Sequence, residues 1–411
     1  MTEKNVPKLR FSGFNETWVK SNLGNVSSDE MYGMNSAATD FDGFNKYIRI
    51  TDISESSNKF VPSPLTSPDG NLDEKFKLKE GDIVFARTGA STGKTYIYDK
   101  NDGNLYFAGF LIKFNINKAY PKFVFYNTLK DEYKNWVSVM SVRSGQPGIN
   151  SNEYKKLPLN IPSLDEQKKI SDFLESIDSK INLLKKKYEY YQEFKKYLMQ
   201  QIFAGKLRFA EFEDDWIPYK IGDISKTYSG GTPSTSKKEY YEGNIPFIKS
   251  GEINNDVTEQ YITEDALKNS SAKRVQKGDL LLALYGATSG EVAISKIDGA
   301  INQAVLKIDN NMDNYFQYCY FLMYKDQIVH KYIQGGQGNL SANIIKKLEF
   351  KYPSLAEQKK ISQFFMSFDN KLELYENKII KYNNLKKGLL QQMFGYVHII
   401  LNFCVKICFI R

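Results

Sequence analysis

The stretch PSLDEQKKIS, residues Pro162–Ser171, recurs as PSLAEQKKIS, residues Pro353–Ser362, and nine of the ten positions are identical. Two more pairs of segments match in the same order. They are LRFSGFNETWVKSNLGNV (Leu9–Val26) with LRFAEFEDDWIPYKIGDI (Leu207–Ile224), and LKEGDIVFARTGASTGKTYI (Leu78–Ile97) with VQKGDLLLALYGATSGEVAI (Val275–Ile294). Similarity that recurs in order along a chain indicates an internal repeat. The chain is therefore two copies of one unit.

Each copy ends in a helix whose start is marked in the sequence. Ser163 followed by Glu166, and Ser354 followed by Glu357, have the spacing of a capping box, in which a hydroxyl and a carboxylate satisfy backbone donors of the first turn. The first helix is predicted to run from Leu164 to Phe203, which is about 40 residues or roughly 60 Å at 1.5 Å per residue. A compact domain does not need a helix of that length.

An apolar seam follows both helix starts in steps of four and three residues. Its members are Ile170, Leu174, Ile177, Ile181, Leu184, Tyr188, Tyr191 and Leu198 in the first copy and Ile361, Phe365, Phe368, Leu372, Tyr375, Ile379, Tyr382 and Leu389 in the second. A mean spacing of about 3.5 residues is typical of a coiled coil. Lys195 and Lys386 interrupt the seam at the same step. We expect an antiparallel pair of helices within the chain, and the alternative is that each helix packs on its own domain.

The segments before the helices consist of short aromatic and β-branched runs separated by turns, which favours strand-rich cores. The predicted fold class is α+β, a tandem repeat of two strand-rich domains that are each followed by a long helix, with pseudo-two-fold symmetry. The predicted division is 1–160 for the first domain, 161–205 for the first helix, 206–352 for the second domain, 353–395 for the second helix, and 396–411 for an apolar tail.

A glycine-rich segment, FARTGASTGKTY (Phe85–Tyr96), is similar to a nucleotide-binding loop. That loop requires Gly, four residues, then Gly-Lys-Ser/Thr opening a helix, whereas only three residues separate Gly89 from Gly93 and strand-like sequence follows. The second copy has Glu291 where the first has Lys94, and an acidic side chain repels phosphate. We interpret Gly89, Gly93 and their counterparts Gly286 and Gly290 as residues of a tight turn, with a loop that also contacts a ligand as the alternative.

The composition restricts the function. The chain has 411 residues, 56 basic and 48 acidic, with a net charge of +8 and a pI of about 8.9, so a polyanion partner is plausible but not required. Three cysteines and two histidines, without a Cys-x-x-Cys pair, favour neither a disulfide framework nor a zinc site. The amino terminus lacks the apolar core of a signal peptide, and Lys406 interrupts the apolar tail, so we expect a cytoplasmic protein without a membrane span.

Two variable domains, each followed by a long helix that opens Pro-Ser-Leu-x-Glu-Gln-Lys-Lys-Ile, resemble the DNA specificity subunit of type I restriction-modification systems, in particular staphylococcal-type subunits. The segment SGGTPSTSKKEYYEGNIPFIKSGEI (Ser229–Ile253) adds to the resemblance, which covers residues 7–394. The apolar tail departs from the family pattern, and no function is assigned to it.

The resemblance implies a subunit without catalytic chemistry of its own. Its two target recognition domains would each read half of a split, asymmetric sequence of double-stranded DNA, while the helices set the gap and dock two adenine N6-methyltransferase subunits. Restriction and translocation subunits would complete the complex. S-adenosylmethionine, ATP and Mg²⁺ would then belong to these partners, and this chain would bind no cofactor or metal.

DNA readers need cations for phosphates and Arg, Lys, Asn, Gln, Ser or Thr for base edges. The first-domain candidates are Arg49, Arg87, Thr88, Ser91, Thr92, Lys94 and Gln146, with Lys46 as a weaker one. The second-domain candidates are Ser229, Gly230, Thr232, Ser234, Lys237, Lys238, Tyr240, Tyr241, Lys249, Ser250, Tyr285, Thr288, Ser289 and Gln337. The alternative for the basic loop at 229–241 is an ordinary solvated loop, and Gln146 and Gln337 could equally close a turn.

Two other classes of protein are alternatives. A scaffold that bridges partners through a coiled coil explains the helices and the repeat, but it does not need two differently faced domains with positive loops. A stand-alone enzyme needs a catalytic constellation, and the sequence offers no methyltransferase Asn-Pro-Pro-aromatic motif and no nucleotide loop.

Overall fold

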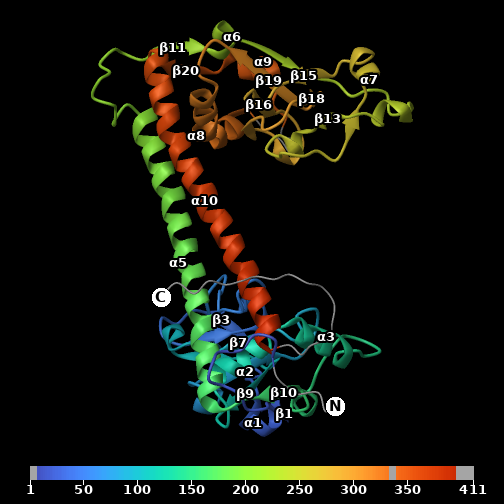
Figure 1. Cartoon of the computed structure of the whole chain (residues 1–411). Helices are drawn as coiled ribbons and strands as arrows, with labels where there is room; N and C mark the ends of the chain where they lie inside the picture. The colour runs from blue at the N-terminus through green and yellow to red at the C-terminus, as the bar shows by residue number, and fades with distance from the viewer. Residues whose placement is uncertain (1–6, 333–338, 395–411) are drawn as a thin grey trace. The chain divides into compact units, whose positions relative to one another are not determined.

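The computed structural model describes residues 7–332 and 339–394, and the predicted tail lies outside them (Figure 1). The chain divides into two compact units, residues 1–184 with 378–411 (unit 1) and residues 185–377 (unit 2). Each unit therefore contains one globular domain and one half of each long helix. Within the described residues, no helix combines the length and the apolar character needed to cross a membrane.

Unit 1 is built on a four-stranded antiparallel sheet in the order β2-β9-β6-β7, with the two-stranded pairs β1-β10, β3-β5 and parallel β4-β8. Its strands are β1 Val19–Asn22, β2 Ser27–Tyr32, β3 Ala38–Asp40, β4 Lys46–Ile48, β5 Thr66–Pro68, β6 Asp82–Ala86, β7 Thr95–Ile97, β8 Leu105–Phe107, β9 Leu111–Ile116 and β10 Pro158–Ile161. Its helices are α1 Leu23–Val26, α2 Pro121–Asn127, α3 Asp131–Met140, α4 Ser151–Tyr154 and the first half of α5 Leu164–Phe203.

Unit 2 repeats this plan. The sheet β12-β19-β16-β17 matches β2-β9-β6-β7, and the parallel pair β13-β18 matches β4-β8 within a second four-stranded sheet, β14-β13-β18-β15. The strands are β11 Ile217–Lys220, β12 Ser225–Ser229, β13 Ile245–Ile248, β14 Tyr261–Ile262, β15 Lys273–Val275, β16 Leu280–Ala283, β17 Val292–Ile294, β18 Gly299–Ile301, β19 Val305–Asn310 and β20 Glu349–Tyr352. The helices are α6 Ile221–Ile224, α7 Glu264–Lys268, α8 Asn314–Tyr332, α9 Ala342–Lys347 and part of α10 Leu355–Phe394. The predicted α+β tandem repeat is confirmed.

The two long helices span the residues that the sequence indicates, with α5 at Leu164–Phe203 and α10 at Leu355–Phe394. All the seam residues are buried or half-buried. In unit 1, Ile170, Leu174, Ile177 and Ile181 of α5 share a core with Leu389 of α10. The same core includes Phe123 of α2, so the first half of α5 packs both on its partner helix and on its own domain.

The helices also pack on each other in unit 2, and they do so antiparallel. The ring of Tyr191 lies 5.5 Å from that of Tyr375, and the ring of Phe194, further along α5, lies 5.9 Å from that of Phe368, which precedes Tyr375 on α10. Figure 1 draws α5 and α10 side by side within this unit. Aromatic contacts of this kind stabilise the pair beyond the area that they bury.

The two lysines that interrupt the seam have equivalent roles. Lys195 Nζ lies 2.5 Å from Asp369 Oδ1, and the Tyr315 hydroxyl of α8 donates to the same carboxylate. Lys386 and Asp178 form the corresponding pair in unit 1, with 2.6 Å between Nζ and Oδ1. There the Tyr126 hydroxyl of α2 donates to Asp178 at 2.9 Å. The repeated interruption is therefore a polar triad that joins both long helices to a domain helix.

The PSLxEQ motif anchors each long helix to its domain. The backbone N–H of Glu166 donates to Ser163 Oγ at 3.4 Å, as a capping box requires, but the Glu166 carboxylate binds the guanidinium of Arg10. Gln167 accepts a hydrogen bond from the Tyr120 backbone at 2.8 Å and donates to the Pro162 carbonyl at 2.9 Å. The identity of the motif between the copies thus reflects tertiary contacts as well as helix capping.

The glycine-rich segment is a hairpin turn between β6 and β7, so Lys94 leads into a strand and not into a helix. Gly93 has a φ of +92°, and a Cβ atom there would lie 2.6 Å from Val137 of α3. Its counterpart Gly290 has a φ of +85°, and a Cβ atom there would lie 2.6 Å from Val329 of α8. Both glycines are required because the turn has positive φ and touches a helix.

Candidate nucleic-acid interface

Unit 1 carries a groove of about 1030 Å³ that gathers several of the predicted contact residues. Its lining includes Arg49, Arg87, Thr88, Ser91 and Gln146, together with Tyr32 and Phe110. These residues come from the end of β2, the segment after β4, the β6–β7 turn, the segment before β9 and the loop before α4. The fold therefore assembles residues that are far apart in the sequence.

The glycine-rich turn and the Gln146 loop are joined through their backbones. Thr88 forms an isolated antiparallel bridge with Gly148, and the backbone N–H of Gly89 donates to the Pro147 carbonyl at 3.0 Å. The Thr92 hydroxyl donates to the Gly89 carbonyl at 2.7 Å and lies 3.3 Å from the Pro147 carbonyl, so it holds this junction. The Gln146 loop therefore both closes the turn and lines the groove.

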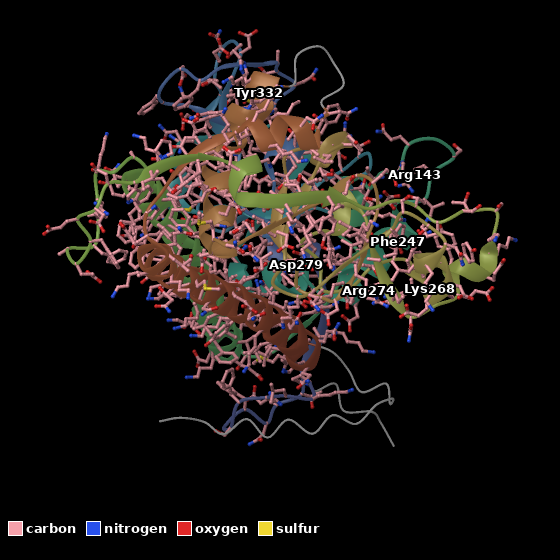
Figure 2. The ribbon with its side chains drawn as sticks, turned by 90° about the horizontal axis from the view of Figure 1, so that it is seen from above. Arg143, Phe247, Lys268, Arg274, Asp279 and Tyr332 are labelled. Atoms are coloured by element: carbon pink, nitrogen blue, oxygen red, sulfur yellow. The ribbon has the colours of Figure 1, made fainter. Side chains whose placement is uncertain are left out.

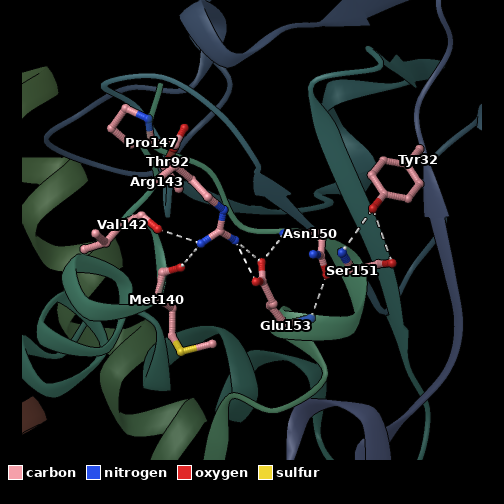
Figure 3. A network of polar contacts seen from close by, with 9 residues as sticks. All are labelled: Tyr32, Thr92, Met140, Val142, Arg143, Pro147, Asn150, Ser151 and Glu153. Carbon is pink, nitrogen blue, oxygen red and sulfur yellow. Dashed lines mark hydrogen bonds and ion pairs between the residues drawn. The ribbon is translucent and has the colours of Figure 1, made fainter. Parts of the chain in front are cut away.

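Arg143 secures the loop from its other side (Figure 3). Its guanidinium contacts both oxygens of Glu153 at 2.5 and 2.6 Å and donates to the carbonyls of Met140 and Val142 at 3.1 and 2.8 Å. Glu153 also accepts from the Asn150 backbone at 2.9 Å and completes the capping box of α4. Sequence reasoning did not single out Arg143. The available signal was its position at the start of RSGQPGIN (Arg143–Asn150), the segment that contains the candidate Gln146.

The candidate cationic side chains of unit 1 differ in whether they already form ion pairs. Arg49 makes two 2.8 Å contacts to Asp52, and this hydrogen bonding raises the pKa of Arg49. Lys94 forms an ion pair with Glu55, donates to the Ile53 carbonyl at 3.4 Å, and does not line the groove. Arg87 forms no ion pair with any described residue. Its Cζ lies 5.1 Å from the Tyr32 ring and 5.9 Å from the Phe110 ring.

A smaller groove of about 430 Å³ in unit 2 gathers part of the second predicted set. Thr232, Lys238, Tyr241 and Lys249 line it. Phe247, Gln260 and Asn302 also line it, and the sequence did not indicate them as contacts. Figure 2 shows Phe247 at the same end of unit 2 as Lys268 and Arg274, which are both exposed. Burial raises the pKa of the Tyr241 phenol, whose hydroxyl donates to the Pro233 carbonyl at 2.7 Å.

The two grooves occupy equivalent places in the repeat. Arg49 and Lys249 each precede a short 3₁₀ helix, Ile50–Asp52 or Ser250–Glu252, that follows a strand of the parallel pair. Ala108 and Asn302 follow the other strand of that pair and line the respective grooves. Equivalent backbone positions therefore carry different side chains.

The other second-domain candidates lie outside the smaller groove. Ser229 ends β12, and Gly230 is needed because a Cβ atom would lie 1.7 Å from the Ile301 carbonyl oxygen. Tyr240 belongs to the core, and its hydroxyl accepts a 3.0 Å hydrogen bond from Lys237 that raises the pKa of the lysine. Ser234 Oγ lies 2.8 Å from Ser236 Oγ, and Ser250 begins a 3₁₀ helix.

Three further candidates belong to the β16–β17 turn. Tyr285 is 39% exposed, Thr288 ends the 3₁₀ helix Gly286–Thr288, and the Ser289 hydroxyl donates to the Leu284 carbonyl at 2.9 Å. Gln337 lies outside the described residues. The structure therefore does not bring this turn and the basic loop into one described groove.

The described part of the chain contains no group of three or more His, Cys, Asp and Glu residues that could hold a metal ion. Both grooves offer hydrogen-bond donors, acceptors and cations, and the groove of unit 1 also has the exposed rings of Tyr32 and Phe110. That chemistry suits an anionic ligand with base-like faces and hydrogen-bonding edges.

Comparisons with known proteins agree on one family. The family model described as "Type I restriction modification DNA specificity domain" matches residues 15–190 and again 213–383. A putative type I restriction enzyme MjaX specificity subunit of Methanocaldococcus jannaschii is 25% identical over 338 residues, which cover 77% of this chain and 78% of that protein. The EcoR124I/EcoR124II specificity subunit of Escherichia coli is 26% identical over 272 residues, or 62% of this chain and 64% of that protein.

The fold has a solved counterpart. The crystal structure of a type-I restriction-modification system S subunit from M. genitalium superposes with a TM-score of 0.63 at 16% sequence identity, covering 95% of this chain and all of that one. At this identity the likeness concerns the fold.

Proposed function

We propose, from the premise that this chain belongs to the type I restriction modification DNA specificity family, that its two domains read the two halves of one split DNA sequence. The chain is the DNA target-recognition subunit of a type I restriction-modification system. One observation supports the proposal that the two domains read different half-sites. Equivalent grooves in the two repeats have different linings, so the halves that they read should differ and the site should not be a palindrome.

The long helices are proposed to set the gap between the half-sites and to dock two adenine N6-methyltransferase subunits. The docking proposal is supported by exposed aromatic side chains on α5. Tyr190, Phe194 and Tyr197 are 60%, 37% and 53% exposed. The rings of Tyr190 and Phe194 stack at 5.9 Å. Aromatic residues are enriched at protein interfaces, and an exposed cluster of them indicates a docking surface.

Catalysis is proposed to lie with the partners. Restriction and translocation subunits would join the methyltransferase subunits, and S-adenosylmethionine, ATP and Mg²⁺ would be bound there while this chain binds none of them. A cytoplasmic location follows from the same proposal, because the DNA that is read is the DNA of the cell.

The proposed function is tested by expressing the chain with its methyltransferase partner and mapping N6-methyladenine across the host genome by single-molecule sequencing. We expect a single split motif that is methylated on opposite strands in its two halves and is absent when the chain is omitted. No new motif, both with the full chain and with a chain that ends at Phe394, would contradict the proposal. The shortened chain shows whether the apolar tail blocks the activity.

A further inference from the structure

At one position the two repeats carry different side chains although the backbone hydrogen bonds are the same. Arg87 in unit 1 corresponds to Leu284 in unit 2. The Arg87 N–H donates to the Phe110 carbonyl at 3.0 Å and its carbonyl accepts from Ile149 at 2.9 Å. Leu284 makes the same two backbone hydrogen bonds, to Ala304 and from Leu340, at 2.8 Å each. The backbone therefore does not require an arginine here.

The neighbours of this position change together with it. By strand register and backbone hydrogen bonding, the positions of Tyr32, Arg87 and Phe110 in unit 1 are occupied in unit 2 by Ser229, Leu284 and Ala304. The leucine is 2% exposed and belongs to the core of unit 2. The arginine instead lies at the groove between two exposed rings, since Tyr32 is 40% and Phe110 59% exposed. Tyr32 and Phe110, the two rings that flank Arg87, form an aromatic clamp. This clamp is thus present in one repeat and absent from the other.

The clamped guanidinium is ready for a ligand. The buried Arg87 Nε has no hydrogen-bond partner, and no described acidic residue pairs with the side chain. Arg49, the other arginine of the groove, is occupied by Asp52. Cation–π contacts with two aromatic rings restrict the guanidinium, so less conformational freedom is lost when it binds.

We propose that Arg87 reads a guanine base in the half-site of unit 1, through the O6 and N7 acceptors of its major-groove edge. This inference rests on the proposed function. Phosphates are the same at every DNA site, so a phosphate contact would be expected in both copies of the frame, whereas a base contact should differ between domains that read different sequences. A bidentate contact from arginine to guanine O6 and N7 is the commonest specific contact in the major groove.

The test compares methylation motifs for the wild-type chain, Arg87→Leu and Lys118→Ala, each expressed with the methyltransferase partner. Arg87→Leu introduces the side chain that the other repeat carries, and Lys118→Ala removes a positive charge from an exposed position of the same unit outside the groove. We expect Arg87→Leu to relax one guanine position in one half-site, with roughly tenfold or greater loss of discrimination. The other half and the Lys118→Ala motif should stay unchanged.

A uniform fall in methylation with an unchanged motif would overturn the proposal, because it would indicate a phosphate or structural contact. Relaxation at a position other than guanine, or a wild-type motif without guanine in either half, would overturn it too. A wild-type chain that gives no split motif, both at full length and when ended at Phe394, would instead refute the proposed function.

A second measurement does not depend on the stability of a variant. The wild-type complex is titrated with duplexes in which each guanine of the motif is replaced in turn by 7-deazaguanine, which lacks the N7 acceptor. We expect weaker binding at one guanine of one half-site, and no loss at that guanine for Arg87→Leu. Equal binding of the wild-type complex to all these duplexes would overturn the proposal, even if Arg87→Leu failed to fold.

Discussion

The guanidinium of Arg10 binds both carboxylate oxygens of Glu166, at 2.6 and 2.7 Å, across 156 positions of sequence. Arg208 and Glu357 repeat the pair in unit 2 with two distances of 2.8 Å. Both glutamates are 1% exposed. Each pair ties the segment that precedes a domain to the first turn of the helix that follows it, and so closes the domain.

Removing the arginine should be costly because it leaves a buried carboxylate uncompensated. Arg10→Leu is expected to lower the free energy of unfolding of unit 1 by about 3–5 kcal/mol. Urea unfolding followed by tryptophan fluorescence measures this. Lys75→Leu is the control, because its pair with Asp73 is exposed and should contribute at most about 1 kcal/mol. Similar losses for the two variants would show that the buried pair is not an anchor.

Lys195 should matter more than its neighbour Lys196. Lys195→Leu leaves Asp369 and Tyr315 without their cation and is expected to cost about 1–3 kcal/mol, less than a fully buried pair because Asp369 is 39% exposed. Lys196 is exposed, so Lys196→Leu should change the stability by about 0.5 kcal/mol or less. Thermal unfolding of both variants provides the comparison, and a smaller effect at position 195 would contradict the role of the triad.

A comparison of Gly93 with Gly13 distinguishes two reasons why a position requires glycine, namely backbone conformation and lack of space for a side chain. Their φ angles are +92° and +94°, but a Cβ atom at Gly13 would have no heavy atom within 4 Å, whereas at Gly93 it would meet Val137 at 2.6 Å. Gly13→Ala should therefore show only backbone strain, about 1–2 kcal/mol. Gly93→Ala should lose clearly more in the same unfolding assay, and equal losses would mean that the contact with α3 is unimportant.

If the helices set the gap, lengthening them should change only the gap. We would insert one heptad after Leu184 and a matching heptad after Asn377, so that the seam stays in register. Seven residues add about 10 Å, which corresponds to about three base pairs at 3.4 Å per step. The methylation motif should keep both half-sites with a gap longer by about three base pairs. An unchanged gap would exclude the helices as the spacer.

Much of the frame could be predicted from the sequence, because it depends on local patterns and on the repeat. The bounds of α5 followed from the capping signal and the seam, and the repeated interruption at Lys195 and Lys386 was visible as a pattern. The partners Asp369 and Asp178 were not, since they lie on the other helix and are identified only by the register of the pair. Similarly, Ser163 indicated the cap, but Arg10 gave no local sign that it takes the Glu166 carboxylate.

The candidate interface was less accessible to sequence reasoning. Loop composition indicated Arg87 and Lys94 equally, yet Lys94 pairs with Glu55 away from the groove while Arg87 lies between two rings. Arg87 directly follows β6 and Lys94 directly precedes β7, and the difference arises because side-chain direction alternates along such extended segments and depends on register. Tyr32 was missed because it reaches the groove from another strand of the sheet.

The central claim, that each repeat reads its own half of one DNA sequence, is tested most directly by exchange of a domain. Residues 210–350 are replaced by the equivalent segment of a divergent family member, and N6-methyladenine is mapped in cells that also express the methyltransferase partner. The account predicts that one half-site changes while the other half is kept, and that exchange of the first domain changes the other half instead. A change in both halves, or in neither, would contradict it.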